Sequence, residues 1–383
     1  MKKNKNVLVV SGFFPYPTFF GGSFDVFGKI LGLTKLGYSI DLVCTYKEEP
    51  NPIDIEYVKT IVADLKLVKR ENNFTNVFFS EPFQVTSRQN LKNVELNKPY
   101  DFLILESESV GTILDNKGLI AKKIFLRVHN NESKYFYQLA KSTKNILKKL
   151  YYMSDAIKYS FYSKKIYSVA DRLWFISNEE IKSENMFFKK SVHLPSPIND
   201  SFSKQDLNNK TALFIGSLFM PNNIEALEWY LNNVHTRFLE DTDYKLIIVG
   251  GTGDLGEAYF ENKFKKLKKV DYYLNAKDLQ PYYALATVFI NPMFHGAGVK
   301  LKTINALVNG LLLVSTQIGA QGIGLINDKM YINAENANEF YEAINKFFKM
   351  DLNGKKQIIK SAQNHLKKNN YINVLKSELI DEI

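Results

Sequence analysis

The chain of 383 residues contains one cysteine, Cys44, and lacks any apolar run near the roughly 20 residues that cross a bilayer. A single cysteine excludes a disulfide framework and a cysteine-based metal site. No group of carboxylates and histidines has metal-ligand spacing, so we expect no metal and no cofactor. The segment Met1–Asn6 leads into a five-residue apolar run, too short for a signal-peptide core. These absences predict a cytoplasmic protein that does not span the membrane.

Positive charge is in excess, with a formal net charge of +10. Two clusters are denser than the background, 141–165 and 263–269, and the first interleaves its lysines with tyrosines and Phe161. Net charge alone fits nucleic acid, but no recognisable module accompanies it, so we expect no nucleic-acid partner. The segment from Tyr135 to Tyr167 favours an anionic membrane surface. The alternative is a helix packed on its own domain with a solvated lysine face.

Short apolar runs alternate with helical stretches in both halves of the chain, which predicts an α/β fold with parallel sheets. The expected strands are 6–12, 39–45, 101–105, 123–128 and 172–177 in the first half and 212–217, 245–250, 287–291, 311–315 and 331–333 in the second. We therefore predict two doubly wound, Rossmann-like domains, 1–199 and 200–363. A single helix is expected from Gly354 to Ile383, and its part 364–383 is a candidate addition to the first domain.

The segment Asn291–Leu307 is the most informative motif. An apolar strand ends at Pro292, the glycine-rich turn Gly296-Ala297-Gly298-Val299 follows, and a helical pattern then begins. Such a turn directs backbone N–H groups and the positive end of a helix toward one point, which suits a phosphate. Lys300 and Lys302 add charge there. The alternative is an ordinary strand-to-helix turn with surface lysines.

Ligands of open α/β sheets bind beyond the carboxyl ends of the strands. Small and polar residues follow most of the expected strands at that edge. They are Ser11-Gly12, Gly21-Gly22, Glu106, His129 to Glu132, Gly216-Ser217, Gly251-Thr252-Gly253 and Gly319 to Gly322. These residues are our candidates for the binding edges of the two domains.

These motifs together resemble glycosyltransferase family 4, within the GT-B glycosyltransferases. The resemblance rests on Pro292, Gly296-Ala297-Gly298-Val299-Lys300, Asn305-Ala306-Leu307, Gly310 and Gly319-Ala320-Gln321-Gly322-Ile323, and on Phe214 to Ser217 with Pro221-Asn222-Asn223. Weaker similarity lies in 17–22, 101–106 and 127–132. It implies the GT-B architecture, with two Rossmann-like domains facing across a cleft.

The resemblance also implies transfer of a sugar from a UDP- or GDP-linked donor, usually with retention and without a metal. The acceptor is expected to be a saccharide or a lipid-linked saccharide, in surface polysaccharide or glycoconjugate biosynthesis. The residues expected to bind the donor are Gly21, Gly22, Gly216, Ser217, Asn222, Gly251, Gly296, Ala297, Gly298, Val299, Lys300 and Asn305.

Three residues of the first half are catalytic candidates. His129 would contact hydroxyls of the donor sugar or polarise the acceptor, although a histidine at a strand end is often structural. Glu132 would orient a substrate or cap the next helix. Glu106 is the third. Arg127 is expected to point away from His129 and to form an internal ion pair, with Glu106 as its candidate partner.

The sequence departs from the family at three positions that are usually acidic. Asn305 stands where a glutamate accepts hydrogen bonds from the ribose, Gln321 replaces the glutamate of Gly-Ala-Glu-Gly, and His295 replaces a glutamate that some relatives carry before the turn. Asparagine still accepts hydrogen bonds but loses the strength that a charge adds. The alternative function is therefore a non-catalytic glycosyltransferase-like subunit that binds a partner enzyme or a nucleotide.

Overall fold

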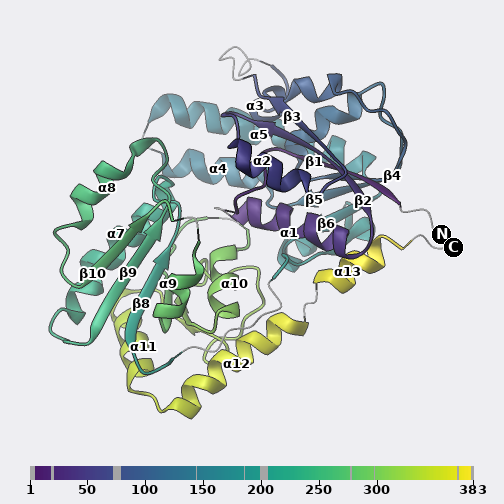
Figure 1. Ribbon diagram of the computed structural model, residues 1–383. Coiled ribbons are helices and arrows are strands. Elements are labelled where there is room, and N and C mark those ends of the chain that lie inside the picture. The colour runs from purple at the N-terminus through teal and green to yellow at the C-terminus, as the bar shows by residue number, and fades with distance from the viewer. Residues whose placement is uncertain are drawn as a thin grey trace. The chain divides into compact units, whose positions relative to one another are not determined.

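The computed structural model describes residues 5–18, 21–71, 79–143, 145–184, 186–198, 206–276, 278–296, 298–368 and 371–380. The chain forms two compact units (Figure 1). Unit 1 comprises residues 1–197 and 371–383, and unit 2 comprises residues 198–370. Each unit is a parallel sheet with helices, which confirms the predicted fold class.

Unit 1 is built on a seven-stranded parallel sheet with the order β3-β2-β1-β4-β5-β6-β7. The strands are β1 (Asn6–Ser11), β2 (Ser39–Tyr46), β3 (Asp64–Lys69), β4 (Tyr100–Leu105), β5 (Ala121–Val128), β6 (Arg172–Phe175) and β7 (Ser191–His193). The helices are α1 (Gly21–Lys35), α2 (Pro52–Lys59), α3 (Phe83–Thr86), α4 (Glu132–Ser142), α5 (Ile146–Val169), α6 (Asn178–Ser183) and α13 (Tyr371–Glu378), with 3-10 turns η2 (Gln89–Asn93), η3 (Glu108–Asp115) and η4 (Phe188–Lys190).

Unit 2 repeats this plan with a six-stranded parallel sheet of order β10-β9-β8-β11-β12-β13. The strands are β8 (Lys210–Ile215), β9 (Tyr244–Gly250), β10 (Val270–Leu274), β11 (Val288–Asn291), β12 (Leu312–Ser315) and β13 (Ile332–Asn333). The helices are α7 (Pro221–Asn233), α8 (Glu257–Phe264), α9 (Gln280–Leu285), α10 (Leu301–Val308), α11 (Ala337–Lys349) and α12 (Leu352–Lys368), with 3-10 turns η5 (His235–Phe238) and η6 (Gly253–Leu255).

The central strands are buried on both faces. Val7, Leu8, Val9 and Val10 of β1 are all fully buried, and alternate residues enter two different apolar clusters. Burial on both sides is what a parallel sheet covered by helices requires, and it explains why these strands appear in the sequence as continuous apolar runs. The strand order reverses between β1 and β4 in unit 1 and between β8 and β11 in unit 2. Ligands of such sheets bind at these reversals.

The C-terminal segment differs from the expected single helix. It forms α12, which belongs to unit 2, and α13, which belongs to unit 1. Tyr371, Leu375 and Leu379 join the apolar cluster of the first sheet. Trp174 Nε1 donates to Glu378 Oε2 at 3.1 Å. The yellow α13 thus lies with the elements of unit 1 (Figure 1).

Helices α4 and α5 of unit 1 begin at asparagine caps. The side chain of Asn131 accepts from Lys134 N at 2.9 Å, and that of Asn145 accepts from Lys148 N at 3.0 Å. These bonds satisfy backbone donors that the first turn leaves unpaired. They divide the basic segment into α4 and α5, which pack against each other. None of the described helices is long and apolar enough to cross a membrane.

Candidate active site

The glycine-rich turn of unit 2 connects β11 to α10, as predicted. Gly296 has a φ of 141° and Gly298 a φ of 71°, conformations that residues with a side chain rarely adopt. Ala297 lies outside the described residues. Helix α10 begins at Leu301, has no acidic residue in its first turn and receives no side-chain hydrogen bond from its cap residue, Lys300. The turn therefore presents a positive helix end without an acidic side chain in that turn.

Two lysines lie at this turn with their ammonium groups on protein acceptors. Lys300 Nζ donates to Gly298 O at 2.6 Å, and Lys302 Nζ donates to Asn223 Oδ1 at 2.9 Å. Lys302 Nζ also lies 5.0 Å from the centre of the Phe214 ring. Burial, and secondarily the charge of Lys300, lower the pKa of Lys302 to about 7. The protonation of Lys302 is therefore poised near neutrality.

The loops after β8 and β9 lie close to the same turn. Leu218 N donates to Gly251 O at 2.8 Å, which joins the loop of Gly216 and Ser217 to the loop after β9. Asn223 Nδ2 donates to Ser217 O at 3.1 Å while its Oδ1 accepts from Lys302. The structure thus brings three of the predicted donor-side loops together.

Other predicted donor residues are linked less directly. A β-carbon at Gly296 would lie 3.6 Å from Asn222 Nδ2, so the start of α7 adjoins the turn. Val299 is half-buried beside Lys300. Asn305 is half-buried one turn into α10, where its backbone oxygen accepts from Asn309 N at 3.0 Å. His295 is exposed, with its Nε2 3.8 Å from Glu225 Oε1.

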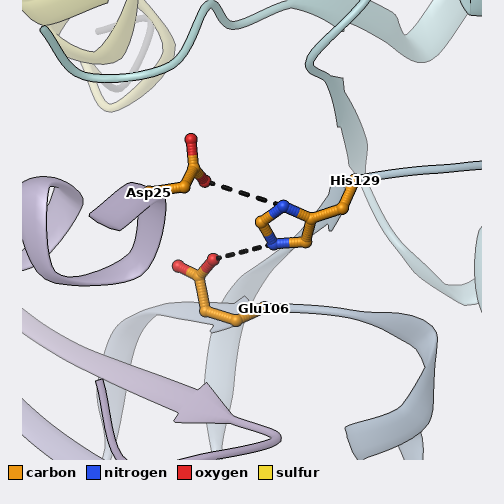
Figure 2. Close-up of side chains that lie close together, drawn as sticks. All are labelled: Asp25, Glu106 and His129. Carbon is orange, nitrogen blue, oxygen red and sulfur yellow. Dashed lines mark ion pairs between the residues drawn. The ribbon is translucent and has the colours of Figure 1, made fainter. Parts of the chain in front are cut away.

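In unit 1, three side chains converge at the carboxyl edge of the sheet (Figure 2). The sequence predicted two of them, Glu106 and His129, and did not predict Asp25. Asp25 comes from α1, Glu106 follows β4 and His129 follows β5. His129 Nδ1 lies 3.9 Å from Asp25 Oδ2, and Nε2 lies 3.8 Å from Glu106 Oε2. These separations exceed hydrogen-bond length. His129 Nε2 is a buried atom without a hydrogen-bond partner in the described structure.

Two buried cations neutralise the carboxylates. Lys29 Nζ lies 2.7 Å from Glu106 Oε2 and 3.3 Å from Asp25 Oδ2. Arg127 donates to both oxygens of Asp25, at 2.7 and 3.0 Å, and also to Leu194 O. All four charged side chains are fully enclosed. A fully enclosed, paired network holds its members in fixed positions.

This network corrects two expectations about Arg127. Its partner is Asp25, because Lys29 takes the place beside Glu106. Arg127 also does not point away from His129, since both side chains approach Asp25. Residues two apart along an extended chain share a face of the sheet, so the expectation was wrong in its geometry.

The network sets the charge of each member. Burial opposes ionisation of Asp25, but Arg127 and Lys29 outweigh it, so its pKa lies below the ordinary value. Burial raises the pKa of Glu106 despite Lys29. Burial, aided by Arg127 and Lys29 against the opposing Asp25, lowers the pKa of His129 to about 4. The imidazole is therefore neutral at pH 7 and can donate from one nitrogen and accept at the other.

Asp25, Glu106 and His129 are also the group of described residues whose atoms could converge on a metal ion. A divalent cation there would meet the ammonium of Lys29 and the guanidinium of Arg127, which already compensate both carboxylates. Like charges at such distances repel strongly inside a protein. The donor set therefore fits an ion-pair network better than a metal centre.

Glu132 is the first residue of α4 and half-buried. Burial and the carboxylates of Glu108 and Glu180 raise its pKa to about 8, with Arg88 opposing. Burial likewise raises the pKa of Glu108 to about 7. At neutral pH Glu132 is thus largely protonated, and its carboxyl can donate a hydrogen bond.

Hydrogen bonds from other side chains to one backbone oxygen, that of Gly12, hold the loop after β1 in place. Gly12 O accepts from Thr45 Oγ1 at 2.7 Å, from Arg88 Nη2 at 3.0 Å and from Arg70. Gly21 and Gly22 form the first turn of α1, where no acidic residue is present.

Sequence reasoning missed Asp25 and Lys29. A signal was present, because an acid and a base four residues apart in the otherwise apolar stretch of α1 share one face of the helix. It also missed Asn223 as the acceptor of Lys302.

Comparisons with known proteins identify the family and the fold. Residues 209–350 match the family model of the glycosyl transferases group 1. Over 377 residues the chain is 35% identical to an uncharacterized 44.6 kDa protein in the cps region of Klebsiella pneumoniae, covering 95% of this chain and 96% of that protein.

Solved structures share the fold at low sequence identity. Sucrose-phosphate synthase from Thermosynechococcus elongatus superposes with a TM-score of 0.70 at 15% identity, over 98% of both chains. The pneumococcal O-GlcNAc transferase GtfA, solved with UDP and GlcNAc, gives 0.68 at 11% identity, and Anabaena HepE, solved with UDP-glucose, gives 0.64 at 10%; both also cover 98% of both chains. This chain belongs to the group 1 glycosyl transferases and has their GT-B fold.

Proposed function

We propose that the protein transfers a sugar from a UDP-sugar to an acceptor, with retention and without a metal ion. The observation that carries the proposal is the β11–α10 turn, where a positive helix end and two lysines adjoin the β8–α7 and β9 loops. Structures of similar fold were solved with UDP-glucose and with UDP and GlcNAc, which supports UDP over GDP as the donor base.

The turn supplies what a departing diphosphate needs. Backbone N–H groups at the start of α10 and the ammonium groups of Lys300 and Lys302 can neutralise its negative charge. Both ammonium groups have protein acceptors nearby, Gly298 O and Asn223 Oδ1, so they are held at the turn before a ligand arrives. Asn305, one turn along α10, faces the ribose in this proposal.

His129 forms a hydrogen bond with a hydroxyl of the reacting sugars. A neutral imidazole with an unpartnered Nε2 can accept from, or donate to, a sugar hydroxyl. Glu106 and Asp25 act as positioning residues, because their oxygens are bound to Lys29 and Arg127. Glu132 orients the acceptor through its protonated carboxyl.

The acceptor is a saccharide carried on a lipid, and the protein works peripherally on the cytoplasmic face of the membrane. Helix α5 carries Ile146, Leu150, Ile157 and Phe161 more than half exposed, and these residues fall on one helical face. Lysines accompany this face, as anionic lipid requires. Similarity to a protein of the Klebsiella cps region supports a place in surface polysaccharide assembly.

Turnover of UDP-sugars tests the proposal. The purified protein should release UDP from one member of a UDP-sugar panel, more rapidly with a lipid-linked acceptor and equally in EDTA. NMR of the product should show the anomeric configuration of the donor. A panel of GDP-sugars, expected to be inactive, is the control.

A second candidate function is a non-catalytic subunit. It is favoured by the neutral residues Asn305 and Gln321 at positions that are acidic in the family. A thermal shift with UDP, but no turnover with any UDP- or GDP-sugar, would establish that alternative. No thermal shift with UDP or GDP would refute both the transferase and a nucleotide-binding subunit, and would leave a subunit that binds a partner enzyme.

A further inference from the structure

A cavity of about 590 Å³ lies in unit 1 between α4 and α5. Carbon-rich side chains line much of it: Tyr137, Met153, Ala156, Ile157, Tyr159 and Tyr167. Polar side chains, including Ser160 and the basic Lys134 and Lys164, contribute the rest. The volume is in the range of small-molecule sites, which span roughly 300–1,000 Å³.

The cavity wall includes residues that follow the candidate catalytic histidine closely in the chain. Asn131 and Ser133 line it, and they follow His129 by two and four residues. Asn131 is fixed because its side chain caps α4 at Lys134 N. Ser133 is fixed because its Oγ donates to Ala156 O of α5 at 2.7 Å. The start of α4 is therefore both the end of the loop after β5 and one wall of the cavity.

The cavity continues into the exposed apolar face of α5. Ile157 belongs to both, since it lines the cavity and is 57% exposed. Phe161, one turn further, is 71% exposed, and Leu150, two turns before, is 62% exposed. The side chain of Ile157 thus gives a hydrocarbon chain an apolar contact at the point where this face meets the cavity.

The charged residues at the cavity determine which polar end an apolar ligand can carry. Lys134 and Lys164 line the cavity, and Glu184 is its acidic lining residue. Two basic groups beside carbon-rich walls are complementary to a molecule that combines an anionic phosphate with an apolar chain. A free saccharide would use the tyrosine rings but would leave the apolar wall of Met153, Ala156 and Ile157 without a matching partner.

We propose that the cavity between α4 and α5 binds the first part of the hydrocarbon chain of a lipid phosphate, with its phosphate at Lys134 and Lys164. This inference rests on the proposed function, because it identifies the lipid carrier as the part of the acceptor that unit 1 recognises. A membrane lipid and the acceptor's own carrier share this chemistry, and the experiment separates them.

Calorimetry with farnesyl phosphate, and with farnesol as the uncharged comparison, tests the cavity. Ser160→Trp places an indole in the cavity and should weaken farnesyl phosphate binding by about tenfold or more. Ser168→Trp is the matched control, since Ser168 is an exposed serine of the same helix that does not line the cavity and, like Ser160, bonds back to a helix carbonyl. It should leave binding within about twofold. Ser160→Leu repeats the test with a smaller side chain if the tryptophan variant does not fold.

Lys164→Gln should reduce binding of farnesyl phosphate and leave binding of farnesol unchanged. Sedimentation with anionic vesicles identifies the source of the lipid. If Ser160→Trp still sediments, the cavity takes the acceptor's carrier; if it loses sedimentation together with farnesyl phosphate, the cavity takes a membrane lipid. Farnesyl phosphate that fails to bind the wild type, or that binds both tryptophan variants equally, overturns the proposal. The proposal is also overturned if the wild type binds N-acetylglucosamine and Ser160→Trp weakens binding of that sugar but not of farnesyl phosphate, because the cavity would then be a saccharide site.

The donor site provides the remaining control. Ser160→Trp should keep the thermal shift with UDP, because the cavity and the β11–α10 turn lie in different units. Loss of farnesyl phosphate binding with an intact UDP response supports the cavity. A wild type that binds farnesyl phosphate but not UDP would refute the proposed function but would still support a lipid-phosphate site in the cavity.

Discussion

Donor binding should take up a proton at Lys302. Burial and Lys300 lower the pKa of this lysine to about 7, so about half of the molecules carry it neutral at pH 7. In the free protein its ammonium has a neutral acceptor, Asn223 Oδ1, and lies over the Phe214 ring. A diphosphate bound at the turn would bring negative charge to this buried group and raise its pKa. The charged form would then predominate in the complex.

The magnitude follows from the two protonation states. If the pKa in the complex is three or more units above that in the free protein, binding at pH 7 takes up about half a proton, and at pH 8 about nine-tenths of one. The sign is fixed, because the lysine is more protonated in the complex than in the free protein. Affinity should therefore fall as pH rises above 7, approaching about tenfold per unit.

Isothermal titration with a UDP-sugar measures this uptake, because the diphosphate of the intact donor has no group of its own that titrates near neutrality. At pH 7.5 the apparent enthalpy in Tris and in phosphate should differ in proportion to the protons taken up. Lys302→Arg keeps the charge at all these pH values and should remove both the buffer dependence and the pH dependence. An enthalpy independent of buffer in the wild type would refute the reasoning.

Three further substitutions probe the two sites. Lys300→Ala should weaken binding of UDP by about 1.5–3 kcal/mol, the scale for a hydrogen bond to a charged group, and unchanged affinity in calorimetry contradicts its role. Asn305→Glu should tighten donor binding or leave it unchanged, since it restores an acceptor charge; abolished binding means that the ribose is held elsewhere. Arg127→Met should cost about 3–5 kcal/mol in urea unfolding, because Asp25 stays buried without its main partner. A cost below about 1 kcal/mol would show that the network relaxes.

The fold was predictable where the strands are central. Strands β1, β4, β8 and β11 are buried along most of their length and so produce nearly continuous apolar runs. The edge strands β3 and β10 were missed because their sequences, DLKLVK and VDYYL, mix charged and apolar residues on half-exposed surfaces. Strand β7 has only three residues, too few for any periodicity.

The candidate site was predictable where it depends on local backbone geometry. The turn at Gly296 and Gly298 is a local motif, and its sequence revealed it. The network around Asp25 depends on a helix and two strands that are far apart in the chain. Hydrophobic pattern does not report which buried charges meet, and Arg127 was assigned to the wrong partner for that reason. Asn223 was likewise invisible as an acceptor, because its donor is 79 residues away.

The return of α13 to unit 1 has a consequence for biosynthesis. During translation the first sheet emerges early, but Tyr371, Leu375 and Leu379, which complete one of its apolar clusters, follow only after residues 198–370. Until then the nascent chain leaves that cluster open, a state prone to aggregation and suited to chaperone binding. Unit 2 is contiguous in sequence and can fold first. A released chain that ends at residue 370 should therefore have a protease-sensitive N-terminal unit and a resistant later unit.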